Sequence, residues 1–375
     1  MHVALNGWFW DQPSVGSGQY LRRLLQHLRE IAPTLQLTLI LPPRNRSPDN
    51  LPPNVNLMIT DGPGGKWGKV WFEQRTFPKM VRQCNADIAH VPYWGPPLSC
   101  PAKLVTTILD VIPLLIPDYA RGVANRLYTA LVSAAAAGST HTITISDAAK
   151  ADIVAQLRLS PESITTTHLA ADESFQPKPN AEQDAAVRQK YSLPNQFVLY
   201  IGGFDRRKQV DLLLLAYTYV ARSVNGNIPL VLAGKEPQWG TSVFPDLRKY
   251  AAELGITEQI YWPGYIDEAD KPSLYRLADM LVFPSRLEGF GLPVLEAMAC
   301  GTPVIANNIA AITEIVGDGA FLVNDAREMA GTMIALWQQP DLRATLIQRG
   351  LAQAAQFSWR ETAQKTLEVY EQLGE

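Results

Sequence analysis

Two glutamates, Glu288 and Glu296, lie close together in an otherwise apolar segment rich in glycine and proline, residues 286–306 (RLEGFGLPVLEAMACGTPVIA). Carboxylates at this spacing suit three kinds of chemistry. The first role is that of a catalytic acid and base, and the second is that of hydrogen-bond acceptors that hold a ligand. The third is that of ordinary helix-start residues, which the helix dipole favours. The spacing leaves all three roles open, so the surrounding elements must decide between them.

The glycines and prolines of this segment predict a short helix over residues 293–300. Pro293 suits the first helical position, because its missing N–H has no partner there in any case. Gly301 suits the left-handed position that ends a helix. A strand is predicted just upstream, so Glu288 lies on a strand-end loop and Glu296 in the first helical turn. The two carboxylates are therefore not equivalent.

The backbone between the glutamates offers a second kind of chemistry. At the predicted helix start, the N–H groups of Phe290, Gly291 and Leu292 have no partner within the helix. A helix N-terminus of this kind attracts anions such as phosphate. On these grounds Glu296 is as easily a dipole-favoured helix residue as a ligand contact, whereas Glu288 is harder to explain structurally.

Three adjacent cations follow a predicted strand in residues 200–216 (YIGGFDRRKQVDLLLLA). A glycine turn precedes Arg206, Arg207 and Lys208, and a helix follows them. Cationic side chains at such a junction suit a diphosphate. Solvated surface cations are an equally good explanation of this segment taken alone.

A small-residue loop occurs in the first half of the chain, where GSGQY includes Gly16 and Gly18. It fails as a dinucleotide fingerprint, because the third glycine and the acidic residue about 20 positions further on are missing. It remains a loop that lets the backbone approach a ligand closely.

Two polar side chains are predicted at strand ends in the same half. Asp110 ends the strand predicted at residues 104–109, so its carboxylate is expected to face a ligand cleft, and a capping role is equally open. His90 is a similar case, although a single strand-end histidine is more often structural than catalytic. We keep Asp110 as a candidate catalytic residue.

Short β-rich runs alternate with helix-like segments along the chain, which predicts parallel α/β domains. The predicted strands are residues 2–5, 35–41, 86–90, 104–109, 141–145, 197–201, 229–233, 260–262, 280–283 and 303–306. The predicted helices include residues 20–31, 148–157 with Ser146 as N-cap, 211–221, 244–254 and 271–277. A polar, proline-containing linker at residues 171–195 predicts two lobes, residues 1–180 and 181–356, whose cleft is the expected ligand site.

Composition excludes several classes of protein. Apolar residues make up 47% and charged residues 18% of the 375-residue chain, which is typical of a globular protein. The absence of a lysine/arginine block argues against a nucleic-acid partner. The sequence contains no HExxH, DxD or Cys/His cluster, so neither a metal nor another cofactor is expected.

Location is predicted from the cysteines and the apolar runs. The three cysteines, Cys84, Cys100 and Cys300, show no paired spacing, and no apolar run reaches the ~20 residues of a membrane span. We read no signal peptide at the N-terminus and expect a reduced, cytoplasmic protein. Residues 119–137 are the one helix suspected of peripheral contact with the inner membrane face, and an ordinary packed helix is the alternative.

Taken together, these residues resemble glycosyltransferase family 4, the retaining, mannosyltransferase-like enzymes of the GT-B fold. Residues 284–306 resemble the family's E-x7-E signature, and GGFDRRKQ its diphosphate segment. GSGQY is similar to its N-terminal glycine loop, and ITISDAAKADI (residues 143–153) to a helix start. The resemblance implies two Rossmann-like lobes with parallel sheets facing across a cleft. Residues 1–180 would form the acceptor-side lobe, and residues 181–356 the lobe that binds the donor nucleotide-sugar. The last helix, within residues 357–375, would cross back to the N-terminal lobe.

The resemblance also implies a role for each site residue of the second lobe. Glu288 would hydrogen-bond the donor sugar and steady positive charge at its anomeric carbon, and Glu296 would bind the nucleotide ribose. Lys208 and Arg207 would neutralise the diphosphate. The amides of Phe290, Gly291 and Leu292 would contact the sugar or phosphate. In the first lobe, Gly16 and Gly18 would let the N-terminal loop close over the donor.

The implied activity is transfer of a hexose from a GDP- or UDP-linked sugar to a hydroxyl of a glycan or lipid-linked acceptor. Two positions depart from the family pattern, since Leu109 stands where a histidine usually precedes the aspartate, and Gly203 where an arginine is common. A catalytically impaired sugar-nucleotide-binding or scaffold protein is therefore the alternative. A two-lobe epimerase is a third option.

Overall fold

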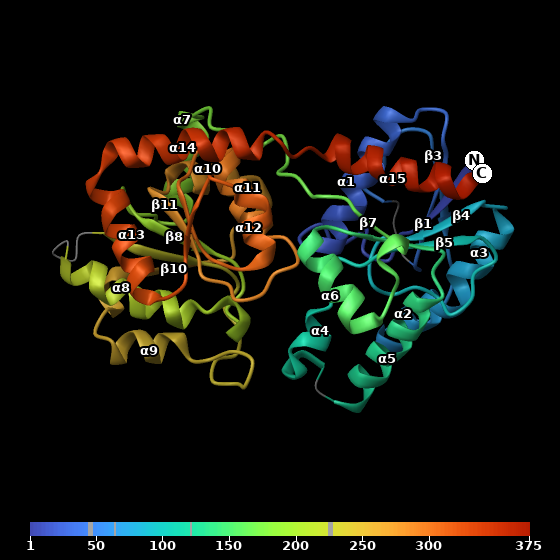
Figure 1. Ribbon diagram of the computed structural model, residues 1–375, viewed down its shortest axis with the longest axis horizontal. Helices are drawn as coiled ribbons and strands as arrows, with labels where there is room; N and C mark the ends of the chain where they lie inside the picture. The colour runs from blue at the N-terminus through green and yellow to red at the C-terminus, as the bar shows by residue number, and fades with distance from the viewer. Residues whose placement is uncertain (44–47, 64, 121, 224–227) are drawn as a thin grey trace. The chain divides into compact units, whose positions relative to one another are not determined.

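The chain folds into two compact units, seen in a computed structural model that describes residues 1–43, 48–63, 65–120, 122–223 and 228–375 (Figure 1). Unit 1 comprises Met1–Leu169 together with Ser358–Glu375, and unit 2 comprises Ala170–Phe357. Each unit has its own parallel sheet flanked by helices, which confirms the predicted α/β class.

Unit 1 has a seven-stranded sheet in the order β3-β2-β1-β4-β5-β6-β7, in which each paired strand is parallel to its neighbour. Its strands are β1 (His2–Asn6), β2 (Gln36–Leu41), β3 (Val55–Ile59), β4 (Ile88–Val91), β5 (Lys103–Thr107), β6 (His141–Thr144) and β7 (Ile164–Thr166). The strand order reverses between β1 and β4. In open parallel sheets, ligands bind beyond the carboxyl ends of the strands at such a switch point.

The helices of unit 1 are α1 (Gly16–Ile31), α2 (Gly65–Trp71), α3 (Phe77–Gln83), α4 (Ile112–Leu115), α5 (Val123–Ala137), α6 (Asp147–Leu157) and α15 (Trp359–Gly374). A π-helical segment, η1 (Phe72–Thr76), joins α2 to α3, and 3₁₀ turns lie at η2 (Pro117–Ala120) and η3 (Pro161–Ser163). The predicted N-cap of α6 is confirmed, because Ser146 Oγ accepts a hydrogen bond of 2.9 Å from Ala149 N.

The C-terminal helix α15 belongs to unit 1, as predicted for the last helix. It packs against α1, where the rings of Tyr20 and Trp359 lie 6.2 Å apart. Tyr370, which is fully buried, hydrogen-bonds His90 at the end of β4. The last residues of the chain therefore complete the core of the unit that contains its first residues.

Unit 2 has a six-stranded parallel sheet in the order β10-β9-β8-β11-β12-β13. Its strands are β8 (Val198–Ile201), β9 (Leu230–Ala233), β10 (Ile260–Gly264), β11 (Met280–Phe283), β12 (Val304–Asn307) and β13 (Phe321–Val323). Its helices are α7 (Ala181–Lys190), α8 (Val210–Ser223), α9 (Leu247–Glu253), α10 (Lys271–Leu277), α11 (Leu292–Ala299), α12 (Ala310–Val316), α13 (Ala326–Gln338) and α14 (Pro340–Ala354), with 3₁₀ turns η4 (Arg206–Lys208), η5 (Thr257–Gln259) and η6 (Glu268–Asp270). The order reverses between β8 and β11.

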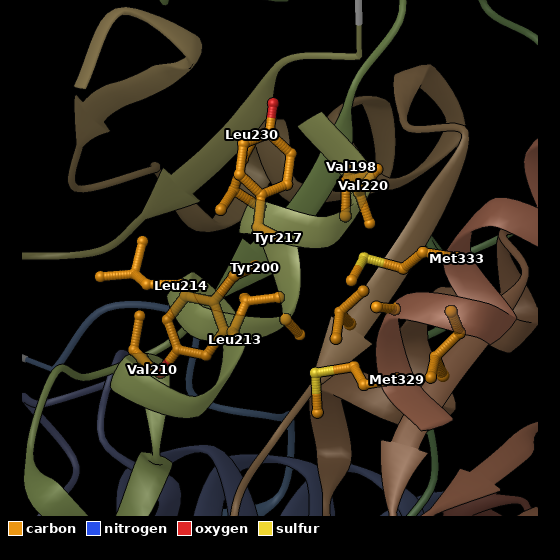
Figure 2. Packing of buried hydrophobic residues seen from close by; sticks show 14 of the residues in the cluster. Val198, Tyr200, Val210, Leu213, Leu214, Tyr217, Val220, Leu230, Met329 and Met333 are labelled. Atoms are coloured by element: carbon orange, nitrogen blue, oxygen red, sulfur yellow. The ribbon is translucent and has the colours of Figure 1, made fainter. Parts of the chain in front are cut away.

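The core of unit 2 fixes these two central strands. Figure 2 shows Val198 and Tyr200 of β8 packed among side chains of α8, such as Leu213 and Tyr217, and of α13, such as Met329. All five are fully buried, which removes apolar surface from water and anchors β8 between its covering helices. The loops that leave the carboxyl ends of β8 and β11 thus start from rigid positions.

The boundary between the units differs from the one predicted at residue 180. Residues 170–180 belong to unit 2, because Phe175 packs against Tyr275 with ring centroids 5.9 Å apart. In addition, Arg276 Nη1 donates to the carbonyl of Gln176 over 3.4 Å. The sequence shows only a polar, proline-containing stretch here, because both contact partners lie about a hundred residues further on.

Three strands escape the sequence prediction. β3 is largely exposed, and β7 and β13 have only three residues each. All three are edge strands, where short or partly exposed runs give a weak pattern of apolar residues.

Candidate active site

Two loops meet at the switch point of unit 2, one after β8 and one after β11. Arg286 N donates a backbone hydrogen bond of 2.9 Å to Arg207 O, which ties the loops together. Glu288 lies on the second loop and accepts from both cations of the first. Its Oε2 is 2.8 Å from Arg207 Nη1, and its Oε1 is 2.6 Å from Lys208 Nζ. The structure thus brings three of the predicted site residues into one ion cluster.

The first loop is shaped by Asp205, which caps the 3₁₀ turn η4. Its carboxylate accepts from Arg207 N over 3.2 Å and lies 3.6 Å from Arg207 Nε. Lys208 Nζ lies 5.1 Å from the ring centroid of Phe283, the last residue of β11. Both cations are therefore held by their own loop and by the end of the neighbouring strand.

Glu288 is an ionised carboxylate in this setting. Burial by itself would raise its pKa, but the charges of Lys208 and Arg207 and the hydrogen bond from Lys208 hold the pKa below its ordinary value. The side chain is only 11% exposed, so few water molecules compete for it. Such a group can accept hydrogen bonds and stabilise positive charge, but it cannot serve as a general acid near neutral pH.

Helix α11 begins directly after this loop, at Leu292, one residue earlier than predicted. Gly291 is its N-cap, with φ of 106°, and a Cβ there would come within 2.3 Å of Ile312 Cδ1. Glycine is thus required both by the backbone conformation and by the packing. The first bond within the helix runs from Val294 N to Gly291 O, so the amides of Gly291 and Leu292 precede it. Phe290 is buried against Phe357, with ring centroids 6.1 Å apart.

Glu296 lies in the second turn of α11, which corrects the prediction of a first-turn position. The helix starts one residue earlier than predicted, so Pro293 takes its second position, and the first turn contains no acidic residue. The carboxylate is buried and accepts a hydrogen bond of 2.8 Å from the hydroxyl of Tyr275. Burial raises its pKa, against the opposing effects of Lys271 and of Tyr275. Its assignment to a ribose stays a prediction.

The end of α11 agrees with the sequence. Cys300 caps the helix, and Gly301 follows it with φ of 74°, the left-handed conformation predicted for this position. Arg206, by contrast, is exposed and donates to the carbonyl of Ser242 over 2.7 Å. Of the two adjacent arginines it is therefore Arg207 that joins the ion cluster.

The two candidate glycines of unit 1 lie in the first turn of α1 and not in the loop predicted for them, because the helix starts four residues earlier than predicted. They differ in what their surroundings require. A Cβ on Gly18 would lie 2.1 Å from Gln12 O and 2.7 Å from Phe9 O, so the packing of α1 on the preceding loop requires glycine there. A Cβ on Gly16 would meet no atom within 4 Å. Internal packing thus explains Gly18 and leaves Gly16 without a structural requirement.

Asp110 lies beyond the strand that was predicted to end at it, because β5 stops at Thr107. Its Oδ1 accepts a hydrogen bond of 3.0 Å from Ile112 N, at the start of α4. This contact is the turn or capping role that the sequence left open. Asp110 and its neighbour Leu109 are half-buried, and a catalytic role for Asp110 stays a prediction.

His90 is a structural residue in this protein. Its Nδ1 lies 2.5 Å from Tyr370 Oη and its Nε2 lies 2.8 Å from Thr107 Oγ1. Burial lowers its pKa to about 3, so the imidazole is neutral at physiological pH. The histidine at the end of this strand is therefore explained by its two hydrogen bonds in the core of unit 1.

Sequence reasoning missed two residues that shape the site in unit 2. Asp205 directly precedes the three cations, and an aspartate before a helical turn is a recognisable N-cap signal. No sequence pattern points to Tyr275, because its contact with Glu296 depends on how α10 packs beside α11.

Two observations concern metals and membranes. Among the described residues, no group of three or more His, Cys, Asp or Glu side chains could hold a metal ion. Within the same part of the chain, every helix is either too short or too polar to cross a membrane.

Two family models match the chain. "Glycosyltransferase Family 4" matches residues 15–175, and "Glycosyl transferases group 1" matches residues 183–353. The O-antigen chain mannosyltransferase B of Escherichia coli is 34% identical over 308 residues, which cover 79% of this chain and 78% of that protein. A serotype-specific mannosyltransferase of the same species is 29% identical over 281 residues, 73% of this chain but only 34% of that longer protein.

Solved structures with the same fold cover nearly all of the chain. Sucrose-phosphate synthase from Thermosynechococcus elongatus matches with a TM-score of 0.74 and 23% identity, covering 100% of this chain and 99% of that one. HepE from Anabaena, solved in complex with UDP-glucose, matches with a TM-score of 0.74 and 18% identity, covering 99% and 100%. At these identities the likeness concerns the fold.

Proposed function

The chain belongs to glycosyltransferase family 4, and we propose that it transfers a hexosyl unit from a nucleotide-diphospho-sugar to a hydroxyl of a glycan or a lipid-linked acceptor. The predicted GT-B fold class is confirmed by the solved structures with which it shares both parallel-sheet units. The identity of 34% to an O-antigen chain mannosyltransferase favours mannose over glucose as the sugar, and polysaccharide biosynthesis as the setting.

The observation that carries the proposal is the ion cluster of Glu288, Arg207 and Lys208 beside the start of α11. Its two cations face the carboxylate of Glu288, and Asp205, 3.6 Å from Arg207 Nε, adds a second carboxylate to their surroundings. A diphosphate placed between these cations and the amides of Gly291 and Leu292 would accept charge-assisted hydrogen bonds from Arg207 and Lys208 and would meet the positive end of the helix dipole. The sugar attached to the diphosphate would then lie beside Glu288.

The proposed chemistry proceeds with retention. The bond between the anomeric carbon and the diphosphate oxygen breaks, and the acceptor oxygen bonds to the same face of that carbon. The proton of the acceptor hydroxyl passes to the departing phosphate oxygen, so no protein base is needed. Glu288 stabilises the positive charge that develops at the anomeric carbon, and Arg207 and Lys208 stabilise the leaving group, without a metal ion.

A panel of labelled GDP- and UDP-linked hexoses tests the proposal with the full chain. We expect slow hydrolysis of a donor without acceptor, transfer to a mannoside acceptor, and activity that persists with EDTA. Product stereochemistry, followed by NMR, should show retention. Binding of a donor without either hydrolysis or transfer would contradict the enzymatic proposal.

That last outcome would favour the alternative, a catalytically impaired sugar-nucleotide-binding protein. The observation behind this alternative is Leu109, an apolar side chain beside Asp110 where a hydrogen-bonding histidine is usual in the family. Leu109→His separates the two possibilities, because an impaired enzyme should gain turnover from the substitution.

We also propose that unit 1 contacts a lipid surface through α2 and α5. The exposed apolar side chains on these helices are Trp67, Trp71, Val123 and Leu127, of which Trp67 is 80% exposed. The exposed cations on and after them are Arg75, Lys79, Arg82 and Arg126. Exposed aromatic residues flanked by cations suit an anionic headgroup layer.

Vesicle sedimentation tests this contact. The double variant Trp67→Ser/Trp71→Ser should lose most of its binding to vesicles that contain phosphatidylglycerol, and binding by the unmodified chain should weaken with salt. Tyr219→Ser, at an exposed position of α8 in unit 2, is the control. Equal binding by all three proteins would exclude α2 as the contact.

A further inference from the structure

A buried polar cluster lies beside the carboxyl ends of strands β1 and β4 in unit 1. Glu73, on the π-helical segment η1, is fully buried. Its carboxylate accepts from the hydroxyl of Tyr128 on α5, at 3.0 and 3.2 Å. Lys69 Nζ on α2 lies 3.6 Å from Glu73 Oε1. A Cβ on Gly95 would come within 2.5 Å of Glu73 Oε1, so glycine is needed for the carboxylate to fit.

The cluster lies where a parallel sheet receives ligands. Tyr93 follows the end of β4, and its hydroxyl donates to Oδ1 of Asn6, the last residue of β1, over 3.3 Å. These are the two strands between which the strand order of unit 1 reverses. Short π-helical segments inside helices also occur often at functional sites.

Burial makes this carboxylate costly as a purely structural element. It raises the pKa of Glu73 to about 7, against the opposing charge of Lys69 and the hydroxyls of Tyr128 and Tyr93. A buried ion pair is weak evidence for stability, since apolar side chains of similar volume often replace it without loss. Buried carboxylates with such a shift are enriched at functional sites.

The exposed rim of the cluster has the chemistry of a sugar site. Lys69, whose side chain is 26% exposed, lies over three aromatic rings, with distances to the centroids of Phe9, Tyr93 and Tyr128 of 5.1, 5.2 and 4.9 Å. The charge of Lys69 is offset by Glu73, which suits neutral hydroxyls better than a phosphate.

Two buried donors at the same edge also lack an acceptor. Asn6 Nδ2, on a fully buried side chain, and Trp94 Nε1 have no hydrogen-bond partner among the described residues. Buried donors of this kind are usually satisfied by a ligand or an ordered water molecule. Asn6 ends β1 and accepts a hydrogen bond from Tyr93, so its amide lies beside the cluster.

We propose that this cluster is the acceptor-sugar subsite, in which Lys69 and Tyr128 contact hydroxyls of a neutral sugar ring and Glu73 acts as a positioning residue for both. The proposal rests on the proposed glycosyl transfer, because it names the site of the acceptor in that reaction. Glu73 itself, being fully buried, acts on the sugar only through its two partners.

The test uses the full chain, a GDP- or UDP-linked hexose as donor and p-nitrophenyl mannobioside as acceptor. Glu73→Gln keeps the shape of the side chain, and Tyr128→Phe removes a single oxygen. We expect the acceptor KM to rise at least about tenfold in both, because Glu73→Gln removes the charge that holds Lys69 and Tyr128, and Tyr128→Phe removes a hydrogen bond to a charged group. The donor KM and the rate of donor hydrolysis should stay within about twofold of the unmodified chain.

A pH profile separates positioning from a merely structural role. The acceptor kcat/KM of the unmodified chain should show an inflection near pH 7, which Glu73→Gln should lack. The charged and titratable groups that face Glu73 are Lys69 on α2, Tyr93 after β4 and Tyr128 on α5. Glu371→Gln, at an exposed position of α15, is the matched control and should keep the inflection.

The outcomes distinguish this proposal from the proposed function. Normal donor hydrolysis with an unchanged acceptor KM in both variants would overturn the subsite alone. A parallel fall in donor and acceptor parameters together with the melting temperature would also overturn it, in favour of a structural cluster. If the unmodified chain turns over no donor, the proposed function fails, and acceptor binding measured by saturation-transfer NMR decides the subsite. Loss of that binding in Tyr128→Phe would support it, and unchanged binding would overturn it.

Discussion

Two carboxylate–cation clusters of this protein shift the pKa of their carboxylates in opposite directions. In unit 2, Glu288 lies between Arg207 and Lys208 and has a lowered pKa. In unit 1, Glu73 has Lys69 as its one cationic partner among the described residues and a pKa raised to about 7. Both side chains are largely shielded from water, so burial alone does not explain the difference.

The number of cations explains it. Burial raises the pKa of any carboxylate, and each cation within about 4 Å lowers it. Two cations outweigh burial at Glu288, whereas Lys69 and the tyrosine hydroxyls do not outweigh it at Glu73. One cluster is therefore suited to stabilising charge in a reaction, and the other to responding to pH.

Removing the charge of Glu288 should have the largest effect. Glu288→Gln keeps the shape of the side chain but removes the negative charge opposite the developing oxocarbenium centre, so we expect kcat to fall by about 10²–10³ or more. Rates of donor hydrolysis and of sugar transfer measure this fall in kcat. Glu258→Gln, at an exposed position of η5, is the control. A rate near that of the unmodified chain would place the reaction centre elsewhere.

Removing one cation from the cluster in unit 2 should make it resemble the one in unit 1. In Lys208→Met, Glu288 keeps only Arg207, so its pKa should rise and donor binding should weaken about tenfold or more, as one charge-assisted contact is lost. Calorimetric titration with GDP and UDP measures the affinity. Unchanged affinity for both nucleotides would show that Lys208 does not contact the diphosphate.

The two clusters should also give opposite pH dependences of stability. Folding raises the pKa of Glu73, so its protonation stabilises the folded chain when the pH is below the pKa of this group in the unfolded chain. This contribution is lost as the pH rises through about 7. Glu73→Gln should therefore gain stability relative to the unmodified chain between about pH 4.5 and pH 7, by about 3 kcal/mol at most.

Folding lowers the pKa of Glu288, so its ionisation stabilises the folded chain when the pH is above the pKa of this group in the unfolded chain. This contribution is lost as the pH falls. Glu288→Gln should therefore lose stability relative to the unmodified chain at neutral pH and less so in acid. Urea unfolding from pH 4 to pH 8 measures both variants. Parallel curves for the two variants would contradict the contrast.

The smallest effect is expected for Arg206, which adjoins the cluster in unit 2 without joining it. Arg206→Gln removes a cation that binds the carbonyl of Ser242, so donor affinity should change by less than about threefold, as for other exposed charges. Arg207→Gln is the matched comparison and should weaken binding at least as much as Lys208→Met. Equal effects of the two arginine substitutions would mean that both reach the donor.

Local sequence patterns fixed much of the fold and part of the site. Strand β11 and helix α10 were predicted with their observed bounds, because a short apolar run and a well-bounded amphipathic stretch depend only on neighbours in the chain. Gly301 ends α11 as predicted for the same reason. The outer strand β3 was missed, since its exposed side chains carry no such pattern.

Local patterns along the chain were enough to predict the alternation of strands and helices, and hence the class of fold, together with the candidates for the site. Which charges meet depends on how the elements pack. Arg207 and Glu288 follow strands that are neighbours in the sheet but not in the chain, and Glu73 reaches Tyr128 on a separate helix. Periodicity and capping are local properties, whereas the pKa of a carboxylate depends on burial and on partners that only the packed chain brings together.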